Sequence, residues 1–181
     1  MVSVRTIHPG EFTFEDLDAL PDDGMQYELV DGVLLVTPSP APLHQRAVLE
    51  IAVLLRAACP PELEVFVAPL DFRPTSRRSL QPDVLVARRE DVGTGALQRP
   101  LVLAVEVLSD STKSTDQLLK RALYAEAGVP SYWLFDPWKP ELAVLELTGE
   151  QYTEYAVVRG ADAFDAVRPF GVRVVPAELV R

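Results

Sequence analysis

The apolar positions of this chain fall mainly into short runs that predict β-strands. Residues 101–109, LVLAVEVLS, form the most apolar run and have the pattern of a strand buried on both faces. Residues 63–72 (LEVFVAPLDF) and 130–137 (PSYWLFDP) predict two more strands. Residues 80–88 (LQPDVLVAR) predict a fourth strand, with Asp83 near its start. These strands are expected to form the centre of the protein.

Helical spacing and capping residues predict three helices. Residues 12–24 predict a short helix that Thr13 can cap. Residues 37–61 predict a proline-rich entry followed by a longer helix, and residues 111–128 predict a third helix that ends at Gly128. One face of the longer helix is expected to carry His44, Val48, Ile51 and Leu55.

Residues 27–36, YELVDGVLLV, predict a β-hairpin that turns at Asp31–Gly32. Pairing about this turn places Glu28 opposite Leu35, so that a carboxylate lies among apolar neighbours. More solvated strands are expected at 141–147, 152–158 and 172–175.

The order of these elements predicts an α+β fold, in which helices flank a mixed central β-sheet. An extra hairpin precedes this sheet and extra strands follow it. The length of 181 residues suits one domain spanning 1–181. We expect its core over about 27–137 and its peripheral strands over 141–175.

The charge of the chain is strongly negative but uneven. The net charge of −10, from 17 basic and 27 acidic residues, argues against a general nucleic-acid binder. Residues 73–89, however, hold five arginines and one aspartate, which gives a basic strip of charge +4. Residues 73–79, RPTSRRS, are expected to form a basic loop within it.

The single cysteine, Cys59, allows no internal disulfide and fits a reducing compartment. Residues 1–20 lack the basic start and apolar run of a signal peptide. No apolar run approaches the roughly 20 residues that cross a bilayer. We therefore expect a cytoplasmic protein without a membrane partner.

Three carboxylates stand in apolar surroundings: Glu28, Asp83 and Glu106. An unpaired charge inside a buried strand costs several kcal/mol, so a partner is needed. If strands 80–88 and 101–109 are neighbours, Asp83 and Glu106 can meet. Mg²⁺ suits such a pair, because it binds through one or two carboxylates, keeps several waters and takes phosphate oxygens.

A nearby cation is the alternative partner. The helix at 111–128 carries Asp116, Lys120 and Tyr124 at steps of four, on one stripe. Lysine is preferred over arginine where a compact ammonium must orient or activate a water. Taken singly, each residue also has a structural interpretation: a solvated pair for Asp116 and Lys120, or a buried ion pair for Glu106.

The remaining candidates also have structural interpretations: Asp83 could be a strand-entry acid, Glu28 a strand-edge carboxylate and His44 a packing histidine.

The motifs of other catalytic chemistries are absent from the sequence. The chain has no glycine-rich phosphate loop and no G-x-S-x-G, and one cysteine with two histidines is too few for a zinc site.

The ordered motifs resemble the Uma-two family of endonucleases, within the PD-(D/E)XK nuclease superfamily. Each motif is weak alone, but the ordered set is specific and covers residues 27–137. The resemblance implies a restriction-endonuclease-like fold. The matching stretches are YELVDGVLLVTPSPAPLHQ, VFVAPLDFR, LQPDVLVA, LAVEVLSDST and DQLLKRALYAEAGVPSYWLFDP.

The resemblance implies that Asp83, Glu106 and the backbone carbonyl of Val107 bind the metal. The superfamily pattern calls for a lysine two residues after the glutamate, where this chain has Leu108. In the Uma-two family the lysine comes from the next helix, which implies Lys120, with Lys113 a lesser candidate. Glu28 matches the family's early acid and completes the catalytic set. The residues implied to line the site are His44, Asp116 and Tyr124.

We therefore expect a hydrolase that cuts phosphodiester bonds in nucleic acid, with DNA as the substrate and Mg²⁺ or Mn²⁺ as the cofactor. A homodimer is expected, because cutting two strands suits a symmetric pair. The groups expected to contact phosphates are Arg73, Arg77, Arg78, Arg88 and Arg89. Two alternatives stay open: a non-catalytic interaction module on the same fold, and a glycosidase with paired carboxylates and no metal.

Overall fold

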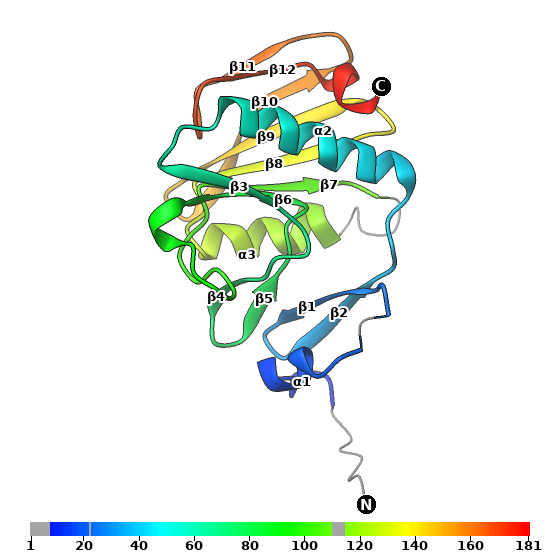
Figure 1. Ribbon diagram of the computed structural model, residues 1–181, viewed down its shortest axis with the longest axis vertical. Helices are drawn as coiled ribbons and strands as arrows, with labels where there is room; N and C mark the ends of the chain where they lie inside the picture. The colour runs from blue at the N-terminus through cyan, green and yellow to red at the C-terminus, as the bar shows by residue number, and fades with distance from the viewer. Residues whose placement is uncertain (1–7, 22, 110–114) are drawn as a thin grey trace, which may run out of the picture.

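The computed structural model describes residues 8–21, 23–109 and 115–181, with the backbone alone for 115–117. Its centre is a six-stranded sheet in the order β10-β9-β8-β7-β6-β3 (Figure 1). β7 and β8 run parallel, whereas the other neighbouring strands of this sheet run antiparallel. The strands are β3 (Leu63–Val67), β6 (Val84–Arg88), β7 (Leu103–Val107), β8 (Ser131–Asp136), β9 (Glu141–Thr148) and β10 (Gln151–Arg159).

Helices cover both faces of the six-stranded sheet (Figure 1). One face packs against α2 (Pro42–Ala58) and the other against α3 (Arg121–Glu126). Along β7, Leu103, Val105 and Val107 face α2, whereas Ala104 faces α3. This two-residue alternation is why β7 reads as a continuous apolar run: each of its faces contacts a helix.

The α2 side is completed by the C-terminal part of the chain. β11 (Phe164–Ala166) and β12 (Val172–Val174) form a two-stranded sheet, and the 3₁₀ helix η3 (Pro176–Val180) follows. Ala166, Val172 and Leu179 belong to the same buried cluster as the inner face of α2. The C-terminal strands therefore close the core on this side.

A second, four-stranded sheet lies beside the first, in the order β2-β1-β5-β4 (Figure 1). The predicted hairpin is confirmed, since β1 and β2 pair with Glu28 opposite Leu35. Its turn residues, Asp31 and Gly32, have φ of 50° and 86°. The strands are β1 (Gln26–Val30), β2 (Val33–Thr37), β4 (Phe72–Thr75) and β5 (Arg78–Leu80); the short helix α1 (Phe14–Asp18) precedes them.

The predicted mixed sheet flanked by helices is confirmed. The condition for Asp83 and Glu106 to meet also holds, because β6 and β7 are neighbours, with Val84 opposite Val105. Two strand predictions were too long. The strand predicted at 63–72 ends at Val67, and the one predicted at 80–88 begins only at Val84. Pro69 and Pro82 lie in the gaps, where each lacks the N–H that a sheet ladder requires.

The prediction of a basic loop at 73–79 was wrong, because this segment is most of the β4–β5 hairpin. The third predicted helix, at 111–128, begins outside the described residues. Its described part is a π-helical turn, Thr115–Lys120, followed by α3. β11 and η3 were not predicted at all. Among the described residues, no helix is both long and apolar enough to cross a membrane.

Gly32 permits the closest approach in the smaller sheet. A Cβ built on it would lie 2.2 Å from the Gly10 carbonyl oxygen, whereas a Cβ on Gly149 would meet nothing within 4 Å. Both glycines have positive φ, so only Gly32→Ala adds a backbone clash to the conformational strain. We expect Gly149→Ala to lower the free energy of unfolding by about 1 kcal/mol and Gly32→Ala by more than about 2 kcal/mol.

Urea denaturation of the two variants beside the wild-type protein measures this difference. Equal losses in both variants would mean that the contact of Gly10 with the hairpin turn is not maintained in solution.

Candidate active site

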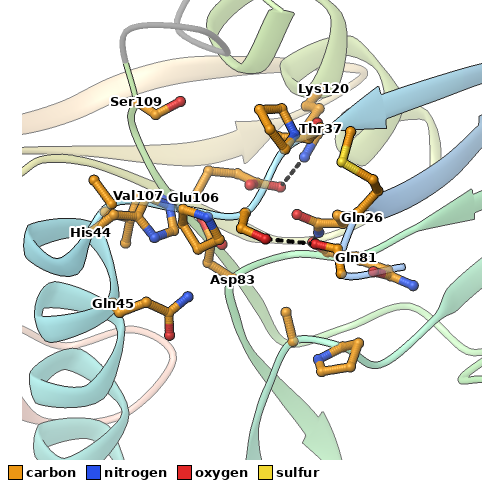
Figure 2. A pocket seen from close by; sticks show the side chains of 18 of the residues that line it. Gln26, Thr37, His44, Gln45, Gln81, Asp83, Glu106, Val107, Ser109 and Lys120 are labelled. Atoms are coloured by element: carbon orange, nitrogen blue, oxygen red, sulfur yellow. Dashed lines mark hydrogen bonds and ion pairs between the residues drawn. The ribbon is translucent and has the colours of Figure 1, made fainter. Parts of the chain in front are cut away.

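A pocket of about 550 Å³ opens where the carboxyl end of β7 meets the smaller sheet (Figure 2). Its volume is in the range of pockets that enclose a small molecule. The pocket collects side chains from β1, β7, the start of α2 and the π-helical turn before α3. The candidate residues that line it directly are His44, Asp83, Glu106, Val107 and Lys120.

Glu106 and Lys120 line the pocket and form a buried ion cluster with Glu28, which is not itself a lining residue. The Lys120 Nζ atom lies 3.1 Å from Glu106 Oε1 (Figure 2). It also lies 3.0 Å from Glu28 Oε2. Glu28, Glu106 and Lys120 are only 2%, 3% and 5% exposed. An ammonium shared between two carboxylates offsets the cost of burying all three charges. The lysine that the sequence predicted therefore contacts both acids of this cluster.

Tyr124 completes the cluster from the first α-helical turns of α3. Its hydroxyl donates a 2.7 Å hydrogen bond to Glu106 Oε1, the same oxygen that faces Lys120. Burial, reinforced by the charge of Glu106, raises the pKa of Tyr124 well above its usual value. The phenol therefore keeps its proton and remains a hydrogen-bond donor.

Local structure explains why these groups converge. Glu106 follows the alternation of β7, so its side chain points to the same face as Ala104, toward α3. Glu28 lies at the middle of β1, and its Oε1 accepts a 2.8 Å hydrogen bond from the Gln81 backbone N–H. The two acids thus come from different sheets, and Lys120 bridges them.

Asp83 lies between the two sheets, just before β6. Its Oδ2 accepts a 2.8 Å hydrogen bond from the Val107 backbone N–H and lies 3.4 Å from His44 Nε2 on α2. Asp83, next to the start of β6, and Glu106, on the neighbouring strand β7, therefore line one pocket. His44 contacts the first acid, whereas Lys120 contacts the second.

The direction of the Val107 carbonyl follows from the hydrogen bonds of its neighbours. In a strand, the N–H and C=O of one residue point to the same side, and those of the next residue point to the opposite side. The Val107 N–H points to Asp83, and the Leu108 N–H points to β8, where it reaches the Phe135 carbonyl. The Val107 carbonyl thus points toward Asp83, beyond the last β6–β7 pair at Val84.

Comparison with known families identifies the chain. The model of the Uma2 family, described as "Putative restriction endonuclease", matches residues 14–177. The chain belongs to the Uma2 family. The resemblance of the ordered sequence motifs to this family is thereby confirmed. No match is found among curated proteins.

A solved structure supports the fold. The crystal structure of "a putative nuclease belonging to DUF820" from Anabaena variabilis is similar, with a TM-score of 0.76 and 18% sequence identity. The alignment covers 93% of this chain and 97% of that one. At this identity the comparison shows the fold alone, and this Uma2 protein has a restriction-endonuclease-like fold.

The pocket contains oxygen donors of the kind that Mg²⁺ takes. Within 8–21, 23–109 and 115–181, no three His, Cys, Asp or Glu residues are grouped to hold an ion. Asp83, Glu106 and the Val107 carbonyl instead offer two carboxylates and one carbonyl oxygen. Mg²⁺ binds through one or two carboxylates and keeps several waters, so this set suits it.

The predicted phosphate-binding arginines are not brought to the pocket, since none of its described lining residues is an arginine. Arg73 pairs with Asp18 and Asp71, and Arg78 pairs with Asp31 and Glu126.

The other three arginines of the basic strip also lie outside the pocket wall, and two of them have intramolecular partners. Arg77 donates to the Gly10 and Asp31 carbonyls, and Arg89 contacts Glu64. Arg88 is exposed at the end of β6. The role of these arginines on nucleic acid stays a prediction, and for four of them an intramolecular partner competes with it.

Two predicted residues are not described in full. Lys113 and the side chain of Asp116 lie outside the described part of the chain. Sequence reasoning also missed parts of the pocket wall, namely Met25, Gln26, Gln81, Ser109, Trp138 and the prolines of the entry to α2. Only the "PSP" segment before His44 gave any signal for the last of these.

Tyr124→Phe tests the buried cluster of the Uma2 protein. The variant removes a hydrogen bond to a charged carboxylate, so we expect the free energy of unfolding to fall by about 2 kcal/mol. The control is Tyr152→Phe, which removes a 2.6 Å bond from another buried phenol, 4% exposed against 0% for Tyr124, to the neutral Val129 carbonyl. It is expected to cost about 1 kcal/mol.

Chemical denaturation at neutral pH measures both variants. A loss for Tyr124→Phe no larger than that of its control would show that the phenol does not stabilise a charged Glu106.

Proposed function

We propose that this Uma2 protein is a Mg²⁺- or Mn²⁺-dependent endonuclease that hydrolyses phosphodiester bonds, with DNA as its substrate. The observation that carries the proposal is the meeting of Asp83 and Glu106 in one pocket, with the Lys120 ammonium 3.1 Å from Glu106. The family, whose description names a restriction endonuclease, supports the same reaction class. A homodimer and a cytoplasmic location stay predictions.

The charges of the pocket support a divalent cation. Among the described side chains, Asp83 and Glu106 line the pocket and Glu28 adjoins them through Lys120. These three acids carry three negative charges when ionised against the one positive charge of Lys120, which leaves −2 for this set. Asp83, Glu106 and the Val107 carbonyl would hold the ion. When bound there, it would supply polarisation of the scissile phosphate and acidification of a water.

Lys120 is the group we assign to the attacking water. Its ammonium can donate a hydrogen bond to the oxygen of that water, and it can stabilise negative charge that develops on the phosphate. Glu28 and Tyr124 position the Lys120 ammonium and the Glu106 carboxylate. Glu28 contacts the ammonium, and Tyr124 contacts the Glu106 oxygen that faces it. His44 can orient Asp83 in the same way.

Asp83→Asn and Glu106→Gln test the metal ligands. Each keeps the shape of the side chain but removes a charged oxygen, so we expect loss of Mn²⁺ binding in calorimetry. Plasmid nicking in Mg²⁺ or Mn²⁺ is expected to fall at least about 100-fold, because the metal supplies several kcal/mol of transition-state stabilisation. Glu146→Gln is the control, since this buried acid on β9 lies outside the pocket wall.

Nicking that survives both substitutions would assign the activity to a contaminant. Absence of Mn²⁺ binding in the wild-type protein, together with a more stable Asp83→Asn variant, would favour the interaction module. The net charge of −10 and the internally paired arginines are the observations on the side of that alternative.

Lys120→Arg separates the charge of this residue from its shape. Arginine keeps a positive charge beside Glu28 and Glu106, but its planar guanidinium cannot place a compact donor at the Nζ position. We expect nicking to fall about 100-fold, with a smaller loss of stability than the 3–5 kcal/mol expected for Lys120→Met. Initial nicking rates and urea denaturation provide the two measurements, and full activity of Lys120→Arg would contradict the assigned role.

A further inference from the structure

We propose that the substrate reaches this pocket as an unpaired strand, with one base stacked on the indole ring of Trp138. The inference rests on the proposed nuclease function and specifies its substrate class. Trp138 lines the same pocket as Asp83 and Glu106 and is 44% exposed. The other tryptophan, Trp133, is 1% exposed in the core.

The position of Trp138 suits a substrate-binding role. It lies in the turn that follows β8, and β8 runs parallel to β7, so both strands present their carboxyl ends on the same side. The Trp138 backbone N–H donates a 3.1 Å hydrogen bond to Asp136 Oδ1, which fixes the start of the turn. The indole therefore stands at the edge of the sheet where Glu106 and Val107 open into the pocket.

The pocket lacks the groups that hold a duplex by its phosphates. Phosphate contacts position double-stranded DNA and come largely from arginine and lysine. Among the described lining residues there is no arginine, and the lysine present, Lys120, is shared between Glu28 and Glu106.

The pocket does offer an exposed aromatic ring on which an unpaired base can stack. Proteins that bind unpaired nucleotides stack the bases on aromatic side chains, because every base has a flat face. Two aromatic rings belong to the described lining residues: the His44 imidazole, which is 6% exposed and contacts Asp83, and the Trp138 indole, which is 44% exposed and so is the ring open to a base. The side chains of Met25, Pro38, Pro40 and Pro69 add apolar surface to the pocket. A pocket of about 550 Å³ has the size of a small-molecule site, so it can accommodate one nucleotide.

The test is a fluorescence titration in Ca²⁺, a cation that also takes oxygen ligands. The probes are a single-stranded DNA oligonucleotide, the matching duplex, and a strand with the same phosphates but abasic sugars. We expect the single strand to quench the exposed tryptophan and to bind at least about tenfold more tightly than the other two probes. Trp138→Ala is expected to abolish the quenching and to weaken single-strand binding about tenfold.

Two further variants control for loss of structure. Trp138→Phe keeps an aromatic face and is expected to bind between the wild type and Trp138→Ala. Tyr155→Ala removes a 61% exposed aromatic ring of β10 that is not part of the pocket wall, and it should bind as the wild type does. Equal binding of the duplex or of the abasic strand, or unchanged binding by Trp138→Ala, would overturn the inference.

Failure of this single-strand inference can be told apart from failure of the nuclease proposal. If Asp83-dependent nicking persists while Trp138→Ala binds normally, only the substrate class proposed here is wrong. If the wild-type protein neither binds Mn²⁺ nor nicks plasmid, yet a single strand quenches Trp138, the nuclease is wrong and the stacking site stands. Negatively supercoiled plasmid, in which strand separation is favoured, should be nicked faster than relaxed duplex.

Discussion

The structure depends on the burial of one ammonium between two carboxylates. Lys120, Glu28 and Glu106 come from the helical segment after β7, from β1 and from β7, so one ion cluster ties three separate elements together. Removing any partner would leave an uncompensated charge away from water, which costs far more than a surface pair contributes. The cluster therefore fixes where the smaller sheet and α3 lie relative to the central sheet.

The connection between β5 and β6 holds Asp83 in place at the pocket. Three residues, Gln81, Pro82 and Asp83, link the two sheets, and both ends of the link are anchored. The Gln81 N–H binds Glu28, and the Asp83 carboxylate binds the Val107 N–H. Because a proline between them has no N–H and a restricted φ, the link has little freedom, and Asp83 is held beside the end of β7.

Much of this arrangement could be predicted from local sequence. A continuous apolar run identified β7, and an Asp-Gly turn fixed the register that puts Glu28 opposite Leu35. The basic hairpin at 73–79 was missed because its arginines resemble a solvated loop, whereas they pair with acids distant in sequence, such as Asp18. Trp138 gave no signal either, since only the fold brings the β8–β9 turn to the pocket.

The lysine of this site is delivered by a helix rather than by the strand that carries Glu106. Here the amine reaches Glu106 Oε1 from the helical turn that ends at Lys120. A genome survey that requires a lysine at a fixed interval after the strand acid would discard this enzyme candidate, because it would find Leu108 there. Searching for an ammonium within contact range of that acid in three dimensions would recover it.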